Sequence, residues 1–214
     1  MLRLQKAKKI GILLDEMYPE QPIPLDHKDI YTLLVAVMLS AQTTDKKVNQ
    51  VTPNLFKIAD NPESMSKLEV DQIREIIREV GLAPTKAKNL KKMALQILDN
   101  NGEIYPDWDF LESLAGVGHK TAGVVMAQGF GKTAFPIDTH IHRLATRWGL
   151  TNGKNVKKTE YDLKKVFQED TWNRRHLQII YFGREHCPAL RHDLTQCPIC
   201  SWAATKKRIH EERK

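Results

Sequence analysis

The fold of this chain is indicated most strongly by LAGVGHKTA, residues 114–122. Gly116 and Gly118 predict a tight turn, because glycine accepts positive φ and allows another backbone to approach closely. This turn follows a short helix, and a second helix begins near His119. Free amide groups at the start of the second helix would form a site for a phosphate. A plain glycine-rich connection between two helices is the commoner meaning of a bare Gly-x-Gly.

Lys120 lies in the first turn of that second helix. The helix dipole disfavours a positive charge there by typically 0.3–1 kcal/mol. Partial burial would lower the pKa of the amine further, and a neutral amine is a nucleophile. Because a lysine in this place does not serve stability, its position favours a functional role over that of a solvated surface residue.

Asp138 lies in PIDTH, residues 136–140, just before another short helix. Aspartate is a preferred N-cap, so capping alone would explain it. Capping is compatible with catalysis, since both need a fixed, ionised carboxylate. An amine and a carboxylate at two helix N-termini, beside a phosphate-binding turn, suit chemistry on a DNA sugar.

The composition agrees with a nucleic-acid partner. The 214 residues carry a formal charge of +7, which favours a polyanion. The longest apolar run, residues 33–39, is far short of the ~20 residues that cross a bilayer. The basic start has no secretory apolar core, and three cysteines argue against a disulfide scaffold. We therefore expect a cytoplasmic protein that is not secreted and not bound to a membrane.

Apolar residues recur every three or four positions along several segments, and none of these segments alternates as a strand would. This pattern predicts an all-α protein of about ten short helices. Three such stripes are Ile10, Leu13, Leu14 and Met17; Ile73, Ile76, Ile77 and Val80; and Ala87, Leu90, Ala94, Ile97 and Leu98.

Residues 114–122 and 138–140 together resemble the endonuclease III family of helix-hairpin-helix (HhH-GPD) DNA glycosylases and AP lyases. Other matching segments follow the family's order, so the resemblance covers nearly the whole chain: LSAQTTD at 39–45, VGL at 80–82, KA at 86–87, GKNV at 153–156 and GR at 183–184. It implies a two-lobed all-α fold with the active-site cleft between the lobes. The lobes would be residues 22–132, with the hairpin at about 109–128, and residues 1–21 plus 133–214, with a cysteine-containing loop at 187–200.

The resemblance also implies an activity in base-excision repair, that of a bifunctional DNA N-glycosylase removing oxidised pyrimidines. Lys120 would attack the sugar, release the base and cut the abasic site by β-elimination through a Schiff base, while Asp138 would stabilise the developing positive charge. The partner would be double-stranded DNA containing damaged pyrimidines or abasic sites. A monomer associated with a bacterial nucleoid is expected.

Six residues are implied as DNA contacts: Gln42, Leu82, Gly116, Val117, Gly118 and His140. Gln42 would fill the space of the flipped nucleotide and Leu82 would wedge the opposite strand, although Leu82 also fits as a core residue at a helix end. Several basic residues near the expected cleft are not assigned individually: Lys86, Lys88, Lys91, Lys92, Arg143 and Arg147.

The cysteines depart from the family pattern, which is C-x₆-C-x₂-C-x₅-C around a 4Fe-4S cluster. Here Cys187, Cys197 and Cys200 give C-x₉-C-x₂-C, and Lys206 stands where the fourth ligand should fall. A histidine, His186 or His192, would complete an iron–sulfur site. Zinc, which binds three cysteines and a histidine, and an empty apolar site are the alternatives. The Cys-x-x-Cys knuckle favours a metal, iron–sulfur first.

Two other functions stay open. A monofunctional mismatch or alkylated-base glycosylase of the same superfamily would release a base without cutting the strand. A non-catalytic helix-hairpin-helix DNA-binding protein would be indifferent to Lys120→Ala and Asp138→Asn. The lysine at 120 favours the lyase.

Overall fold

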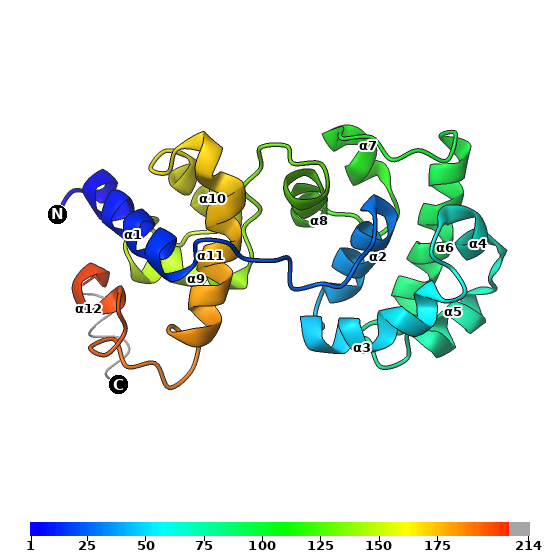
Figure 1. The fold of residues 1–214 in the computed structure, drawn as a ribbon, viewed down its shortest axis with the longest axis horizontal. Coiled ribbons are helices and arrows are strands. Elements are labelled where there is room, and N and C mark those ends of the chain that lie inside the picture. Colours follow the sequence, from blue (N-terminus) through cyan, green and yellow to red (C-terminus); the bar gives the residue numbers. More distant parts are fainter. Residues whose placement is uncertain (206–214) are drawn as a thin grey trace. The chain divides into compact units, whose positions relative to one another are not determined.

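The computed structural model describes residues 1–205, which contain helices and no strand (Figure 1). The predicted all-α class is confirmed, with twelve α-helices in this part of the chain. The sequence periodicity predicts only about ten helices, because helices of four to six residues are too short to show a repeat of apolar residues. Contacts divide the chain into two compact units, one formed by Met1–Pro22 and the chain from Thr133 onward, the other by Ile23–Lys132.

The unit formed by Ile23–Lys132 is built around α2 (Ile30–Ser40), in which every side chain from Tyr31 to Leu39 is buried. A helix that is apolar all round must be buried, and α2 contains the longest apolar run of the sequence. Among the described residues, no helix is long and apolar enough to span a membrane. The other helices of this unit are α3 (Asp45–Phe56), α4 (Pro62–Lys67), α5 (Val70–Ile76), α6 (Ala83–Asp99), α7 (Trp108–Ser113), α8 (His119–Val124) and the π-helix η1 (Val125–Gly129).

The second unit packs the N-terminal helix against segments from the second half of the chain. Trp148 and Phe182 are fully buried in its core, with their rings edge to face at 5.8 Å. Its elements are α1 (Arg3–Met17), α9 (Thr139–Arg147), α10 (Val156–Lys164), the 3₁₀ helix η2 (Glu169–Thr171), α11 (Trp172–Glu185) and α12 (Cys200–Ala203).

An ion pair joins α1 to α11. Both terminal nitrogens of Arg175 donate to the Asp15 carboxylate, each at 2.7 Å, and Gln178 donates to the same carboxylate at 3.1 Å. Arg175 is almost completely buried, so it depends on this paired geometry. Gly11 leaves room for the guanidinium, since a Cβ there would lie 3.0 Å from Arg175 Nη2.

Because of Asp15, we expect the stability of this unit to fall at acid pH. Hydrogen bonding from Arg175 lowers the pKa of Asp15 from 3.8 to about 2. Because the folded pKa lies below the unfolded one, the pair stabilises the protein above pH 4, and this contribution is lost as pH falls towards 2. We expect Asp15→Asn to lower the free energy of unfolding at pH 7 and to flatten its fall between pH 4 and 2. Urea denaturation at several pH values measures both.

The exposed carboxylate Asp71, which pairs with Arg74 on the surface, provides the control. Asp71→Asn should leave the acid dependence unchanged, as exposed ion pairs contribute little. If Asp15→Asn also keeps the wild-type slope between pH 4 and 2, Asp15 is not the group responsible.

Candidate active site and metal-binding cluster

The predicted hairpin is formed by α7, a turn at residues 114–118, and α8. Gly116 has φ +81°, and a Cβ there would lie 2.9 Å from Asn89 Nδ2 on α6. Glycine is therefore required both by the backbone conformation and by the close approach. The Val117 side chain is buried, and its amide donates to the Leu114 carbonyl at 3.0 Å. The turn is thus fixed from within its own unit.

Gly118 differs from Gly116. Its φ of −98° is ordinary, and nothing in the described chain lies within 4 Å of the position its Cβ would take. The prediction that the turn itself needs glycine at both positions is therefore wrong for Gly118. The backbone at this helix start is exposed and open to an external group.

Lys120 lies in the first turn of α8, as predicted, and its side chain is exposed. The partial burial considered for it is not found. His119, the preceding residue, joins the two arms of the hairpin: its Nδ1 lies 2.7 Å from a Glu112 oxygen, and its ring stacks on Trp108 with centroids 4.9 Å apart. The lysine therefore projects from a braced helix start.

The second hairpin helix continues from α8 into the π-helix η1. Short π-helical segments are rare and often accompany functional sites. Gly129, at the end of η1, packs on α2, since a Cβ there would lie 3.0 Å from Ile30 Cδ1 and 3.1 Å from Leu33 Cδ2. The helix that carries Lys120 is thereby attached to the core of its unit.

Asp138 is the N-cap of α9, and its Oδ1 accepts a hydrogen bond from the Ile141 amide at 2.7 Å. The segment before it is held by α11: His176 Nδ1 lies 2.8 Å from the Pro136 carbonyl, and Asn173 accepts from the Ala134 amide at 3.0 Å. The half-buried carboxylate is therefore fixed in place.

His140, another predicted DNA contact, is half-buried in the same unit. Its Nδ1 lies 3.2 Å from Arg143 Nη2. The ring also packs on Gly183, where a Cβ would lie 3.1 Å from His140 Nδ1. The ring is thus part of the packing between α9 and α11.

Gln42 and Leu82 share an unusual backbone. Both are exposed and left-handed, with φ of +56° and +63°. A non-glycine residue in this region costs roughly 1–2 kcal/mol, and such strain clusters at functional sites. Leu82 is 54 % exposed, which rules out the alternative of a core residue.

The loops that carry Gln42 and Leu82 touch each other. The Gly81 amide donates to Thr43 Oγ1 at 3.0 Å, and a Cβ on Gly81 would lie 2.8 Å from the Gln42 carbonyl oxygen. Lys86 supports this contact from within, because its buried ammonium donates to Leu39 O at 2.8 Å and Ala41 O at 2.5 Å. The two exposed side chains are therefore presented from one braced surface.

Two of the six basic residues near the expected cleft are buried, Lys86 and Arg147, and their contacts are internal. Arg147 donates from α9 to Cys187 Sγ at 3.2 Å and to the Pro188 carbonyl at 2.7 Å. Sequence reasoning missed both roles, because a lysine or arginine on a helix gives no local sign that tertiary structure will bury it.

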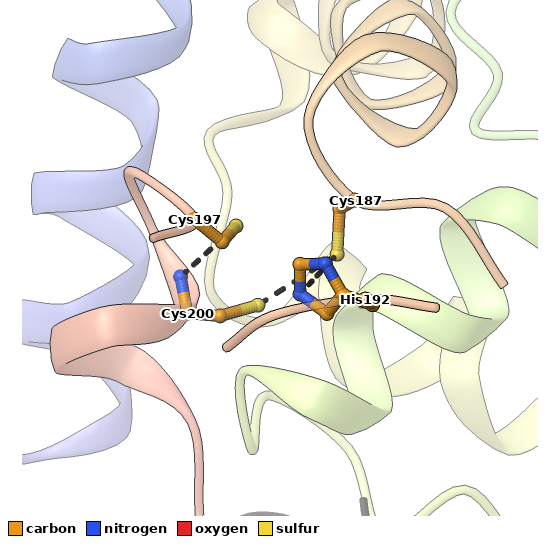
Figure 2. A group of neighbouring side chains, drawn as sticks. All are labelled: Cys187, His192, Cys197 and Cys200. Atoms are coloured by element: carbon orange, nitrogen blue, oxygen red, sulfur yellow. Dashed lines mark hydrogen bonds between the residues drawn. The ribbon is translucent and has the colours of Figure 1, made fainter. Parts of the chain in front are cut away.

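The three cysteines come together with His192 (Figure 2). Cys187 follows α11, Cys197 lies three residues before α12, and Cys200 is the first residue of α12. The ligand atoms of these four residues, which we call the Cys/His cluster, all lie within 4.8 Å of one another, and the cysteines are buried. The cluster could hold a metal ion.

Of the two candidate histidines, only His192 joins the cluster. Its Nε2 lies 3.4 Å from Cys187 Sγ. His186 instead packs on Phe182, with ring centroids 5.3 Å apart. Lys206, which stands where the family's last cysteine would fall, lies outside the described residues.

The thiols of the cluster interact with one another and with their surroundings. Hydrogen bonding between Cys187 and Cys197 lowers the pKa of Cys197 and raises the pKa of Cys187. The Cys200 amide donates to Cys197 Sγ at 3.4 Å. The Cys200 amide and the Arg147 guanidinium, which both donate to cysteine sulfurs, are the kind of outer contacts that orient the thiolate ligands of a metal.

Comparison with known proteins agrees with this architecture. The profile of the "HhH-GPD superfamily base excision DNA repair protein" family matches residues 35–169. Endonuclease III of Treponema pallidum (strain Nichols) is 38 % identical over 200 residues, covering 92 % of this chain and 95 % of the relative. Endonuclease III of Bacillus subtilis (strain 168) is 38 % identical over 203 residues, covering 94 % and 93 %.

A solved structure agrees as well. The trapped endonuclease III–DNA covalent intermediate, in an estranged-adenine complex, has a TM-score of 0.92 and 34 % identity, and the match covers 99 % of this chain and 100 % of that one. The chain therefore belongs to the HhH-GPD superfamily of base excision DNA repair proteins.

Proposed function

We propose that this chain is a bifunctional DNA N-glycosylase and AP lyase that removes oxidised pyrimidines from double-stranded DNA. The observation that carries the proposal is the exposed Lys120 in the first turn of the second hairpin helix, in a chain whose relatives are named endonuclease III. A nucleophile is also what a covalent intermediate with DNA, trapped in a related protein, requires.

In the proposed reaction the Lys120 amine attacks C1′ of a nucleotide flipped out of the duplex, because this carbon is shielded within the stack. The C1′–N bond breaks and the base leaves with the electron pair. The amine and the opened sugar form a Schiff base, after which loss of a C2′ proton breaks the C3′–O bond. Asp138 helps to deprotonate Lys120 and stabilises the positive charge that develops on the sugar.

The hairpin turn is proposed to bind a backbone phosphate through Gly116, Val117 and Gly118, with His140 as a further DNA contact. Open space beside Gly118, the N-cap of α8, supports this role, since it leaves the backbone accessible to a phosphate. Free amides at a helix start suit an anion. Binding should weaken steeply with salt, as phosphate contacts release counterions.

Gln42 and Leu82 are proposed to enter the duplex when the damaged nucleotide leaves it. Their exposure and left-handed backbones support this role, because neither feature serves the stability of the free protein. A side chain that fills the vacated space offsets part of the cost of unstacking.

Leu82→Gly should therefore change stability and activity in opposite directions. Relief of the left-handed strain should raise the free energy of unfolding by about 0.5–1 kcal/mol, net of glycine's greater chain entropy. Loss of the wedge should slow processing of a damaged duplex roughly tenfold or more, since flipping costs a few kcal/mol. Urea denaturation and single-turnover kinetics measure the two effects.

Two further variants separate the relief of backbone strain from the loss of the wedge side chain. Leu82→Ala removes the wedge but keeps the strain, so it should lose activity without gaining stability. Asn101→Gly relieves another left-handed residue, at the end of α6, and should leave activity unchanged. Full activity of Leu82→Gly would contradict the proposed wedge.

The proposed enzyme acts as a monomer on chromosomal DNA in the bacterial cytoplasm, in keeping with its bacterial relatives. No step of the reaction passes through the Cys/His cluster. A metal bound there would have a structural role.

Three duplexes test the proposed function: one with thymine glycol, one with an abasic site and one undamaged. The proposal expects cleavage of the first two without alkali and none of the third. Release of the base with cleavage only after alkali would instead identify a monofunctional glycosylase. Binding without any processing would identify a DNA-binding module.

A further inference from the structure

We propose that the Cys/His cluster binds a single zinc ion through Cys187, His192, Cys197 and Cys200, in the place where the family pattern has a four-iron cluster. The site is a structural one, and its occupancy does not depend on the proposed catalytic function. The distances between the ligand atoms, the identity of the four donors and the residues around them all favour zinc.

The distances fit one tetrahedral ion. With Zn–S of about 2.3 Å and Zn–N of about 2.0–2.1 Å, two sulfurs on one zinc lie about 3.8 Å apart, and a sulfur and a nitrogen about 3.5 Å apart. The structure has 3.7 Å between Cys187 Sγ and Cys200 Sγ, and 3.4 Å between Cys187 Sγ and His192 Nε2. All four ligand atoms lie within 4.8 Å of one another.

A four-iron cluster does not fit the same atoms. Its four ligands bind four different irons at the corners of a cube, so that their donor atoms lie on the order of 6 Å apart. The 4.8 Å that contains every pair of donor atoms here is too small to enclose such a cube. The three cysteines alone also leave one iron without a thiolate.

The donors point to zinc in particular. Three cysteines and one histidine form a common closed structural zinc site, and Cys197 and Cys200 are spaced as a Cys-x-x-Cys knuckle. His192 is presented by a strained loop, since the preceding residue Arg191 is left-handed with φ +54°. Strain of this kind persists where the surroundings fix it.

Charge balance supports the same occupant. One Zn²⁺ with three thiolates and a neutral imidazole carries a net charge of −1. The buried Arg147 guanidinium, 3.2 Å from Cys187 Sγ, supplies the compensating positive charge. The Cys200 amide that donates to Cys197 Sγ at 3.4 Å is a further outer contact typical of thiolate sites.

The ion would fasten α12 to the rest of its unit. It would join Cys187, which closely follows α11, to the loop that carries His192 and to the segment from Cys197 to Cys200. Lys6 of α1 lies beside this segment and donates to the carbonyls of Ala203 and Trp148, both at 2.8 Å. Removal of the ion should therefore loosen the contact of α12 with α1 and α9.

The direct test is metal analysis of the full chain, produced in cells supplied with iron and purified anaerobically. The proposal expects one zinc per chain, no acid-labile sulfide and no brown chromophore. The metal-free protein, offered excess ferrous iron and sulfide, should form no four-iron cluster. With one equivalent of Co²⁺ it should show the strong visible bands of a tetrahedral thiolate site.

Matched histidine variants test the ligand set. His192→Ala should lower zinc affinity at least tenfold, measured by competition with a chromophoric chelator, and lower the melting temperature by on the order of 5 °C. His186→Ala, which removes a neighbouring histidine outside the cluster, should retain wild-type affinity. His192→Cys should restore a single zinc, which guards against a His192→Ala protein that simply fails to fold.

Four irons with four sulfides per chain, a single iron, or no metal in the wild-type protein would each overturn the proposal. Equal loss of zinc in His186→Ala and His192→Ala would overturn the assignment of the fourth ligand. Neither the metal analysis nor the zinc affinities depend on DNA cleavage. A negative result in either would therefore not bear on the proposed catalytic function.

Discussion

Lys120→Ala is expected to abolish strand cleavage at thymine glycol and abasic sites, with a loss of at least ~10³-fold in single-turnover rate. In the proposed reaction this amine supplies both the nucleophile and the Schiff base, so its removal should leave C1′ without the attacking group. Because Lys120 is exposed in the first turn of α8, where the helix dipole disfavours a cation, its removal should leave stability unchanged or slightly raised.

Lys57→Ala provides the matched control, since Lys57 is an exposed lysine of the same unit, at the end of α3. It removes the same charge and should keep the wild-type cleavage rate. DNA binding by Lys120→Ala should weaken only modestly, because the variant loses one of the many positive charges that the proposal places on the duplex. Undiminished cleavage by Lys120→Ala would show that the nucleophile is another group.

Asp138→Asn is expected to lower cleavage by ~10²-fold or more while the protein keeps its stability within about 0.5 kcal/mol. Asparagine caps a helix as well as aspartate does, so the hydrogen bond from the Ile141 amide survives. The negative charge that is proposed to assist Lys120 and to stabilise the sugar cation is lost, and general acid–base assistance typically contributes 10²–10⁴-fold.

Asp138→Ala separates the two roles further. It should lose the same activity and also about 1 kcal/mol of stability, because the cap is removed. Urea denaturation and single-turnover cleavage, measured on both variants, give the comparison. If Asp138→Asn cleaves like the wild type, Asp138 is only a cap, which is the simpler explanation of an aspartate in this position.

The features predicted correctly from sequence are local ones. The helix-turn-helix around Gly116 and the cap at Asp138 depend on residues within a few positions of each other, and both are present. Positions set by tertiary contacts were not predicted or were left open. Lys86 and Arg147 are buried supports, which the sequence did not indicate, and the sequence did not decide between His186 and His192, of which His192 joins the cysteines. The left-handed backbones of Gln42 and Leu82 have no sequence signature, since leucine and glutamine usually avoid that conformation.

Borohydride trapping followed by peptide mapping would show whether Lys120 forms the proposed Schiff base. Wild-type protein, an abasic duplex and borohydride are mixed, the covalent adduct is isolated, and the modified residue is located by mass spectrometry. We expect one adduct per chain, on the peptide that contains Lys120, and none with Lys120→Ala. An adduct on another amine, or no adduct from a protein that still cleaves the strand, would contradict it.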